Sequence, residues 1–224
     1  MTIVTPLDLL KSMPCFSELS SEVMDWFLDF VKEHSCAKGE IILIEGERCP
    51  GLFVVKSGSV KLYRSSREGE EQIVRVVRSG GCFECAPLFD KGPNPVSAAA
   101  LEASSVYLVS ASDFELLLNT YPEIALQIVP VLAMRLRSLL NMVEDFSFRP
   151  VTSRLAKLLL KQGEHERKVT AASKLLNQQH LACILGCSRQ VLNSALRKLV
   201  RDGILKMEGR RIVILKPDIL REIV

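Results

Sequence analysis

The sequence predicts an α+β protein built from an antiparallel β jelly roll, a long dimerisation helix and a C-terminal winged helix-turn-helix. Three observations lead to this expectation. From residue 37 to about residue 110 the hydrophobic period is two, as in half-buried strands. A seam of apolar residues at helical spacing follows, and two short helices joined at a glycine lie near the end. We place the three parts at residues 1–111, 112–148 and 149–224.

Composition places the chain among ordinary globular proteins. It has 224 residues, of which 48% are hydrophobic and 25% are charged, and this balance excludes a disordered chain. No apolar run approaches the roughly 18 residues of a membrane span. The start of the chain lacks the basic head, apolar core and cleavage site of a signal peptide. We therefore expect a cytoplasmic protein with no membrane partner.

Charge is distributed unevenly along the chain. Residues 1–145 hold 13 Lys and Arg against 20 Asp and Glu, a net charge of −7. Residues 146–224 hold 16 against 6, a net charge of +10. A short basic part at one end of a chain is typical of a module that binds a polyanion, although a solvated basic surface has the same composition.

The first part combines helical and strand patterns. Helical spacing covers residues 7–12 and 20–32. The β-forming stretches are EIILIEG, GLFVVKSGSVKLYRSS, QIVRVVRSG and SAAALEASSVYLVS, and Gly, Pro or charged turns separate them. Several short strands at this spacing favour an antiparallel sandwich or barrel over alternating βαβ units.

A helix capped by Ser112 or Asp113 precedes a longer helix that starts at Pro122. The apolar positions of the longer helix step by four and three residues over about three heptads. The central seam residues are Val129, Leu132, Leu136, Leu139 and Val143. This spacing predicts a homodimer, and a single helix that covers its own sheet is the alternative. Pro130 should kink the helix, and residues 148–152 form a predicted hinge.

Residues 177–203 carry the clearest motif. Asn177 caps a first helix that Gly186 ends, and Ser188 caps a second helix. The second helix is expected to face the core with its apolar side chains, which are Val191, Leu192, Ala195, Leu196 and Leu199. A hairpin over residues 204–215 completes a winged helix-turn-helix. A helical hairpin that binds protein is the alternative interpretation.

The outward side chains of this motif suit double-stranded DNA. Arginine pairs with guanine, and Gln or Asn pairs with adenine, so the start of the second helix is predicted to read bases. Arginines farther along that helix and on the hairpin suit phosphates. The predicted DNA contacts are Ser188, Arg189, Gln190, Asn193, Arg197, Arg210 and Arg211.

The sequence resembles the CRP/FNR transcription regulators over residues 16–215, most clearly in GLFVVKSGSVKLYRSSREGEE, FRPVTSRLAKLL and GCSRQVLNSALRKL. Members are homodimers with a β-roll sensor domain, and they bind palindromic DNA when an effector repositions the reading heads. The resemblance implies an effector-gated regulator that is not an enzyme and that has RNA polymerase as a partner. Gln190 stands where the family often has Glu, and Ser194 where it commonly has Arg, so we expect a different half-site.

In the cyclic-nucleotide members of that family, a cassette matching residues 80–97 binds ribose and phosphate. The family pattern there is Gly-Glu and later Arg-Ser-Ala, whereas this chain has Glu84-Cys85 and Val96-Ser97-Ala98. Losing a bidentate Arg and gaining a carboxylate opposes binding by about 2–4 kcal/mol, so neither cAMP nor cGMP is expected. The candidate effector-binding residues are Cys82, Glu84, Cys85 and Ser97.

Cys82 and Cys85 form a Cys-x-x-Cys pair, which suits a metal, an iron–sulfur cluster or a dithiol. The FNR branch holds its cluster through cysteines near the amino terminus, where this chain has only Cys15. Haem bound by His34 or by one of the pair is a further alternative, and plain burial is another. The effector is therefore left open among redox, gas and metal signals. A small redox or metal enzyme using the pair is the alternative function, although no catalytic triad, phosphate loop or dinucleotide fingerprint is present.

Overall fold

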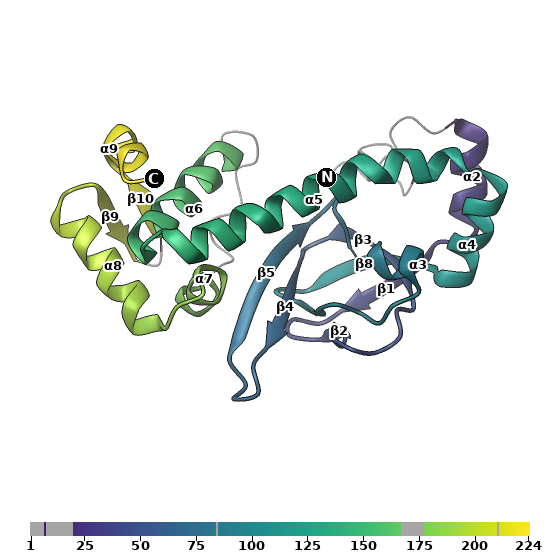
Figure 1. Cartoon of the computed structure of the whole chain (residues 1–224), viewed down its shortest axis with the longest axis horizontal. Helices are drawn as coiled ribbons and strands as arrows, with labels where there is room; N and C mark the ends of the chain where they lie inside the picture. Colours follow the sequence, from purple (N-terminus) through teal and green to yellow (C-terminus); the bar gives the residue numbers. More distant parts are fainter. Residues whose placement is uncertain (1–6, 8–19, 84, 167–176, 210) are drawn as a thin grey trace. The chain divides into compact units, whose positions relative to one another are not determined.

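The computed structural model describes residues 7, 20–83, 85–166, 177–209 and 211–224. The chain divides into two compact units, residues 1–68 with 74–138 and residues 69–73 with 139–224. The first unit holds the strand-rich part, and the second holds the C-terminal helices and hairpin (Figure 1). The boundaries placed at residues 111 and 148 from the sequence stay a prediction.

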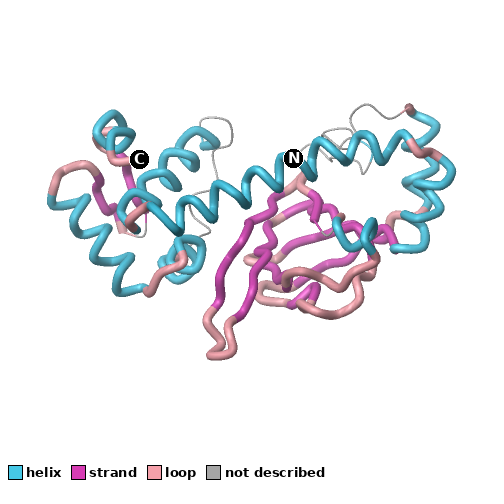
Figure 2. Tube along the Cα trace, in the orientation of Figure 1, coloured by secondary structure: helices cyan, strands magenta, loops and turns pink. Residues whose placement is uncertain are grey.

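Among the described residues, eight strands form the β roll: β1 (Lys32–Cys36), β2 (Ile41–Leu43), β3 (Gly51–Ser57), β4 (Ser59–Ser65), β5 (Glu71–Arg78), β6 (Cys82–Phe83), β7 (Ser97–Ala100) and β8 (Ser104–Ser110). They make two four-stranded sheets, in the orders β1-β8-β3-β6 and β2-β7-β4-β5 (Figure 2). The described pairings between them are antiparallel. The predicted jelly roll is confirmed.

The interior of the roll is an apolar cluster drawn from both sheets. Phe53 on β3 stacks on Phe83 on β6, with ring centroids 5.1 Å apart. Val55, Val60 and Val106 are fully buried around them. Because side chains of a strand alternate between its two faces, the period of two in the sequence supplies this single buried face.

A second apolar cluster joins helices to the outside of the roll. It involves α2 (Ser21–Asp29), α3 (Ala86–Asp90), α4 (Ala111–Thr120) and α5 (Glu123–Phe148). Met24, Phe114, Ile124 and Ile128 are among its buried members. The first turns of α5 are therefore anchored to the β roll by burial of their apolar face.

Two element boundaries differ from the sequence expectation. Ser110, not Ser112 or Asp113, caps α4, because its Oγ accepts a hydrogen bond from Asp113 N at 3.1 Å. The helix predicted over residues 20–32 ends at Asp29, and β1 begins at Lys32. The helix predicted over residues 7–12 lies, apart from residue 7, outside the described residues.

α5 continues as one helix through Pro130. Among the described residues, no single helix is long and apolar enough to cross a membrane, and α4 and α5 meet that criterion only as a pair bent by 117°.

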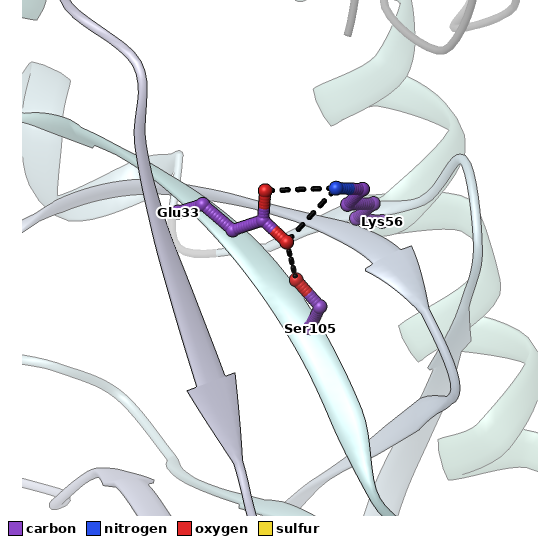
Figure 3. A network of polar contacts seen from close by, with 3 residues as sticks. All are labelled: Glu33, Lys56 and Ser105. Atoms are coloured by element: carbon purple, nitrogen blue, oxygen red, sulfur yellow. Dashed lines mark hydrogen bonds and ion pairs between the residues drawn. The ribbon is translucent and has the colours of Figure 1, made fainter. Parts of the chain in front are cut away.

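Three strands of one sheet are tied by a polar network on the surface. Glu33 on β1 accepts two hydrogen bonds from Lys56 Nζ on β3, at 2.9 and 2.8 Å, and one from Ser105 Oγ on β8 at 2.6 Å (Figure 3). The pKa of Glu33 is lowered by its hydrogen bonds from Lys56 and then Ser105. The carboxylate form therefore stabilises this edge of the sheet.

The second unit has its own core. Its elements are α6 (Val151–Glu166), α7 (Gln178–Leu185), α8 (Arg189–Arg201), β9 (Leu205–Glu208), β10 (Arg211–Ile214) and α9 (Pro217–Glu222). Leu155, Leu192, Leu199 and Leu220 are almost fully buried in the cluster that these helices share. β9 and β10 form the predicted antiparallel hairpin.

Candidate functional site

The two short helices are capped as the sequence predicts. Asn177 Oδ1 accepts a hydrogen bond from His180 N at 2.8 Å at the start of α7. Gly186 ends that helix in the left-handed conformation, with φ 59°. Ser188 Oγ accepts from Val191 N at 3.3 Å at the start of α8. The turn between the helices is thus set by hydrogen bonds within a few residues, and it determines where α8 begins.

α8 buries one face, and one prediction for that face is wrong. Leu192, Ala195, Leu196 and Leu199 are buried, but Val191 is 45% exposed. At 100° per residue, Val191 lies on the row that continues through Ser194 and Lys198, beside the buried face and not within it. With Val151 and Thr152 of α6, this row lines a shallow hollow.

The predicted DNA contacts on α8 lie on its solvent side. Ser188, Arg189, Gln190 and Arg197 are exposed, and Asn193 is half-buried. Neither Arg189 nor Arg197 forms an ion pair with any residue that the structure describes. Their guanidinium groups are therefore available to an anion or a base edge. Arg210 lies outside the described residues, and only the backbone of Arg211 is described, in β10.

The predicted hinge falls between α5 and α6, whose bounds leave only Arg149 and Pro150 outside a helix. Arg149 Nε lies 2.9 Å from Asp145 Oδ1. The Arg154 guanidinium lies over the ring of Phe146, 5.0 Å from its centroid. The first contact joins the break to the end of α5, and the second joins α5 to α6 across the break.

The candidate effector residues occupy the first unit. Ser97 Oγ accepts a hydrogen bond from Glu45 N at 3.0 Å, so this hydroxyl is used to hold neighbouring backbone. Cys82 and Cys85 are 5% and 2% exposed, and their Sγ atoms are 4.0 Å apart. The structure thus brings the two thiols together. Glu84 lies outside the described residues.

Two arginines that the sequence reasoning missed surround the thiols. Arg135 of α5 donates from Nη2 to Cys82 O at 2.7 Å and to Cys82 Sγ at 3.3 Å, and its Nη1 is 3.6 Å from Cys85 Sγ. Arg75 of β5 donates from Nη1 to Cys82 O at 3.2 Å. The sequence signal for Arg135 was its position directly before the seam residue Leu136. Heptad spacing alone, however, does not reveal which residues a charged side chain contacts.

Two family models match the chain in agreement with this geometry. The cyclic nucleotide-binding domain matches residues 33–121, and the Crp-like helix-turn-helix domain matches residues 153–223. Together they cover more than half of the chain. The chain belongs to the CRP/FNR family of transcriptional regulators. The resemblance read from the sequence is thereby confirmed. The chain carries a DNA-binding helix-turn-helix of the Crp type.

Relatives support the assignment over most of the chain. The chain is 29% identical over 181 residues to a CRP-like cAMP-activated global transcriptional regulator of Mycobacterium tuberculosis, covering 79% of this chain and 81% of that protein. It is 26% identical over 214 residues to the cyclic AMP receptor protein of Thermus thermophilus, covering 96% and 98%. The solved structure of FixK2 from Bradyrhizobium japonicum matches with a TM-score of 0.74 at 26% identity, over 86% of this chain and 96% of that one.

The donor set at the thiol pair does not fit the metal centres that some CRP/FNR members carry. Within the described part of the chain, no three His, Cys, Asp or Glu side chains converge. A zinc site or an iron–sulfur cluster takes four ligands, and the two guanidinium groups beside Cys82 and Cys85 repel a cation. His34 is exposed on β1 and does not join the buried thiols, which disfavours it as their haem partner. Cys15 lies outside the described residues.

The electrostatic surroundings of the Cys82 and Cys85 sulfurs differ. The pKa of the Cys85 thiol is raised well above its usual range, first by its hydrogen bond to Cys82 and then by burial. The pKa of Arg75 is lowered by burial and by the positive charge of Arg135. Cys85 therefore stays a thiol, while Cys82 Sγ accepts the guanidinium hydrogen bond. The two sulfurs thus lie close to each other and beside two cationic side chains.

Proposed function

We propose that this CRP/FNR regulator binds palindromic DNA as a cytoplasmic homodimer and that an effector gates the binding. The observation that carries the proposal is the start of α8, where Ser188 caps a helix whose exposed face presents Arg189 and Gln190. The surrounding residues 146–224 carry a net charge of +10, which favours a polyanionic partner. Arg189 suits guanine, Gln190 and Asn193 suit adenine, and Ser188, Arg197, Arg210 and Arg211 suit the backbone.

The proposed dimer uses the apolar seam of α5. Val129, Leu136, Leu139 and Val143 are 58%, 60%, 45% and 62% exposed, and Leu132 is half-buried against the β roll. Exposing these apolar side chains to water costs free energy. Their alternating steps of four and three residues let them pack well against a second copy of the same helix. Two copies would present two reading heads about one helical turn, roughly 34 Å, apart on DNA.

Gating would act as a population shift between two arrangements of the reading heads. The break at Arg149 and Pro150 is the proposed hinge, since it separates α5 from α6, the helix that precedes the helix-turn-helix. RNA polymerase is the proposed further partner, by the family resemblance. The Mycobacterium tuberculosis relative is named as a transcriptional regulator, which favours regulation over an enzymatic use of Cys82 and Cys85.

The proposed effector is not cyclic AMP, although two of the relatives are named for it. Val96 stands where the cyclic-nucleotide members have the phosphate-binding Arg, and it packs against the interior of the β roll. The Ser97 hydroxyl is already bonded to Glu45 N. Among redox, gas and metal signals, the buried thiol pair beside two arginines favours a redox signal and gives no support to haem or an iron–sulfur cluster.

Selection from random DNA duplexes tests the proposal. The full chain is incubated with the library, and bound duplexes are sequenced. We expect a palindrome with half-sites about 10 base pairs apart, and a steep loss of affinity with added salt because several phosphates are neutralised. Enrichment of a single non-repeated site would contradict the dimer. Absence of any enriched sequence would contradict specific recognition by α8.

A further inference from the structure

We propose that Cys82 and Cys85 form a reversible disulfide when a hydroperoxide oxidises them, and that Arg135 transmits this change to helix α5. The thiol pair, not an organic effector, is thus the signal receiver. The effect on DNA binding rests on the function proposed above, whereas disulfide formation does not.

The positions of the two sulfurs suit a disulfide. They are three residues apart, and the Sγ atoms lie 4.0 Å from each other inside the same apolar cluster. A disulfide needs the sulfurs to approach to about 2.05 Å, a movement that side-chain rotation accomplishes for a Cys-x-x-Cys pair. Burial at 5% and 2% exposure restricts the reaction to a small oxidant, and hydrogen peroxide meets this requirement.

The contacts assign different roles to the two sulfurs. Arg135 Nη2 donates to Cys82 Sγ at 3.3 Å, whereas Arg135 Nη1 lies 3.6 Å from Cys85 Sγ, so the guanidinium favours a thiolate at Cys82 over one at Cys85. Cys82 is the attacking sulfur, and Cys85, which keeps its proton, is the resolving one.

The chemistry balances with the peroxide as oxidant. The Cys82 thiol first loses its proton to solvent, and the thiolate attacks one peroxide oxygen. The O–O bond breaks, the leaving hydroxide takes up a proton, and Cys82 becomes a sulfenic acid. Cys85 Sγ then attacks Cys82 Sγ, and the Cys85 proton leaves with the hydroxyl group as water. Two thiols and one hydrogen peroxide give one disulfide and two water molecules. A thiol reductant reverses the change.

Arg135 links this chemistry to the proposed seam. Its guanidinium holds both sulfurs and Cys82 O from α5, and it lies next to Leu136 in the chain. A disulfide carries no charge and is a weaker acceptor than a thiolate, and closing it draws the Cys82 sulfur toward Cys85. The hydrogen bonds that hold α5 to the cassette therefore weaken on oxidation. Arg135 is a positioning residue, and we expect the oxidised protein to dimerise and bind DNA less tightly.

Mass spectrometry of the full chain tests disulfide formation directly. Trypsin cleaves after Arg78 and Lys91, so one peptide, residues 79–91, contains both thiols. After treatment with hydrogen peroxide we expect this peptide to lose about 2 Da and to resist alkylation until it is reduced. Cys82→Ser and Cys85→Ser should each abolish the loss, and Cys49→Ser, a change at a third buried thiol of the same cluster, should not. A peptide that stays fully alkylated overturns the disulfide.

DNA affinity before and after oxidation tests the transmission. We expect oxidation to weaken binding to the selected palindrome about tenfold in the unaltered protein and less than about twofold in Arg135→Gln. Arg135→Lys keeps the charge but not the two-armed hydrogen bonding, so it should also lose most of the response to oxidation. It replaces Arg135→Gln in the affinity measurement if that variant does not fold. Unchanged or tighter DNA binding on oxidation, with the disulfide present, overturns the transmission.

A failure of the proposed function gives a different pattern. If reduced protein binds no DNA, the peptide assay still decides the disulfide. The monomer–dimer equilibrium, measured by sedimentation in both redox states, then decides the transmission. Equal dissociation constants would overturn it.

Discussion

Asp145, near the end of α5, accepts two hydrogen bonds from Lys157 Nζ on α6, at 2.8 and 2.7 Å. The same carboxylate lies against Arg149, so it joins three positions around the break at Pro150. Asp145 is only 17% exposed, which strengthens its attraction to the two cations relative to a surface ion pair. The contact holds the first turns of α6 to the end of α5.

Asp145→Asn should loosen this junction. The amide keeps the shape of the side chain but loses its charge, and we expect the free energy of unfolding to fall by about 1 kcal/mol, since Lys157 is partly solvated. DNA affinity should fall with it, by roughly threefold to tenfold, because the orientation of α6 is less restricted. Chemical denaturation and fluorescence titration measure the two effects. The control is Asp218→Asn, which breaks the exposed pair with Arg221. Equal effects of the two variants would show that Asp145 does not hold the junction between α5 and α6.

Arg189→Ala should weaken specific DNA binding by about 1–3 kcal/mol and relax base preference at one position of each half-site. Arg189 is exposed at the first position of α8 and has no ion-pair partner among the residues that the structure describes. Arg221→Ala, which removes the same charge from α9, is the matched control and should change affinity little. The readout is affinity for the selected palindrome and for single-base variants of it. Unaltered base preference would argue against Arg189 as a reader.

Leu136→Asp should convert the proposed dimer to monomers. The side chain is 60% exposed on one copy, and a charge at this position would be buried unpaired in a helix–helix seam. Leu139→Asp is expected to act in the same way. Leu116→Asp on α4 introduces the same charge at a site 49% exposed and away from the seam, so it should leave the molecular mass unchanged. Light scattering distinguishes the cases, and a dimer that survives Leu136→Asp would refute the seam.

Calorimetric titration with cAMP or cGMP should give no binding heat. By the family resemblance, Val96 stands where the cyclic-nucleotide members have a phosphate-binding Arg, and losing that bidentate contact is expected to cost about 2–4 kcal/mol. Restoring it with Val96→Arg is the informative companion. Affinity in the micromolar range for the unaltered protein would show that other residues of the cassette bind the phosphate.

Glu33→Gln should destabilise the β roll near neutral pH and have little effect in acid. The pKa of Glu33 is lowered in the folded protein by hydrogen bonds from Lys56 and Ser105. A lowered folded-state pKa adds stability above the unfolded-state value, and this stability is lost as the pH falls through the folded-state value. The group is exposed, so we expect a difference in Tm of on the order of one degree at pH 7 that vanishes as the pH falls below the folded-state pKa. A difference that grows on acidification would contradict the assignment.

Much of the fold follows from short-range patterns. The caps at Asn177 and Ser188 are hydrogen bonds between residues three apart, and the left-handed Gly186 needs only its own missing side chain. Such signals lie within one turn of chain, so they are readable in a single sequence. The period of two in the strands and the heptad spacing of α5 are equally local patterns.

The thiol site and the side of α8 that carries Val191 were decided by tertiary structure. Arg135 meets Cys82 across 53 residues of sequence, because the packing of α5 against the β roll sets which helix face turns toward the cassette. Val191 is apolar at a position next to the buried row, and only the packing of α8 against α6 leaves it in solvent. The sequence by itself determined most of the elements, the caps of α7 and α8, and the family. The tertiary structure alone decided which distant side chains meet, because those contacts depend on helix rotation and sheet stacking, which no local pattern encodes.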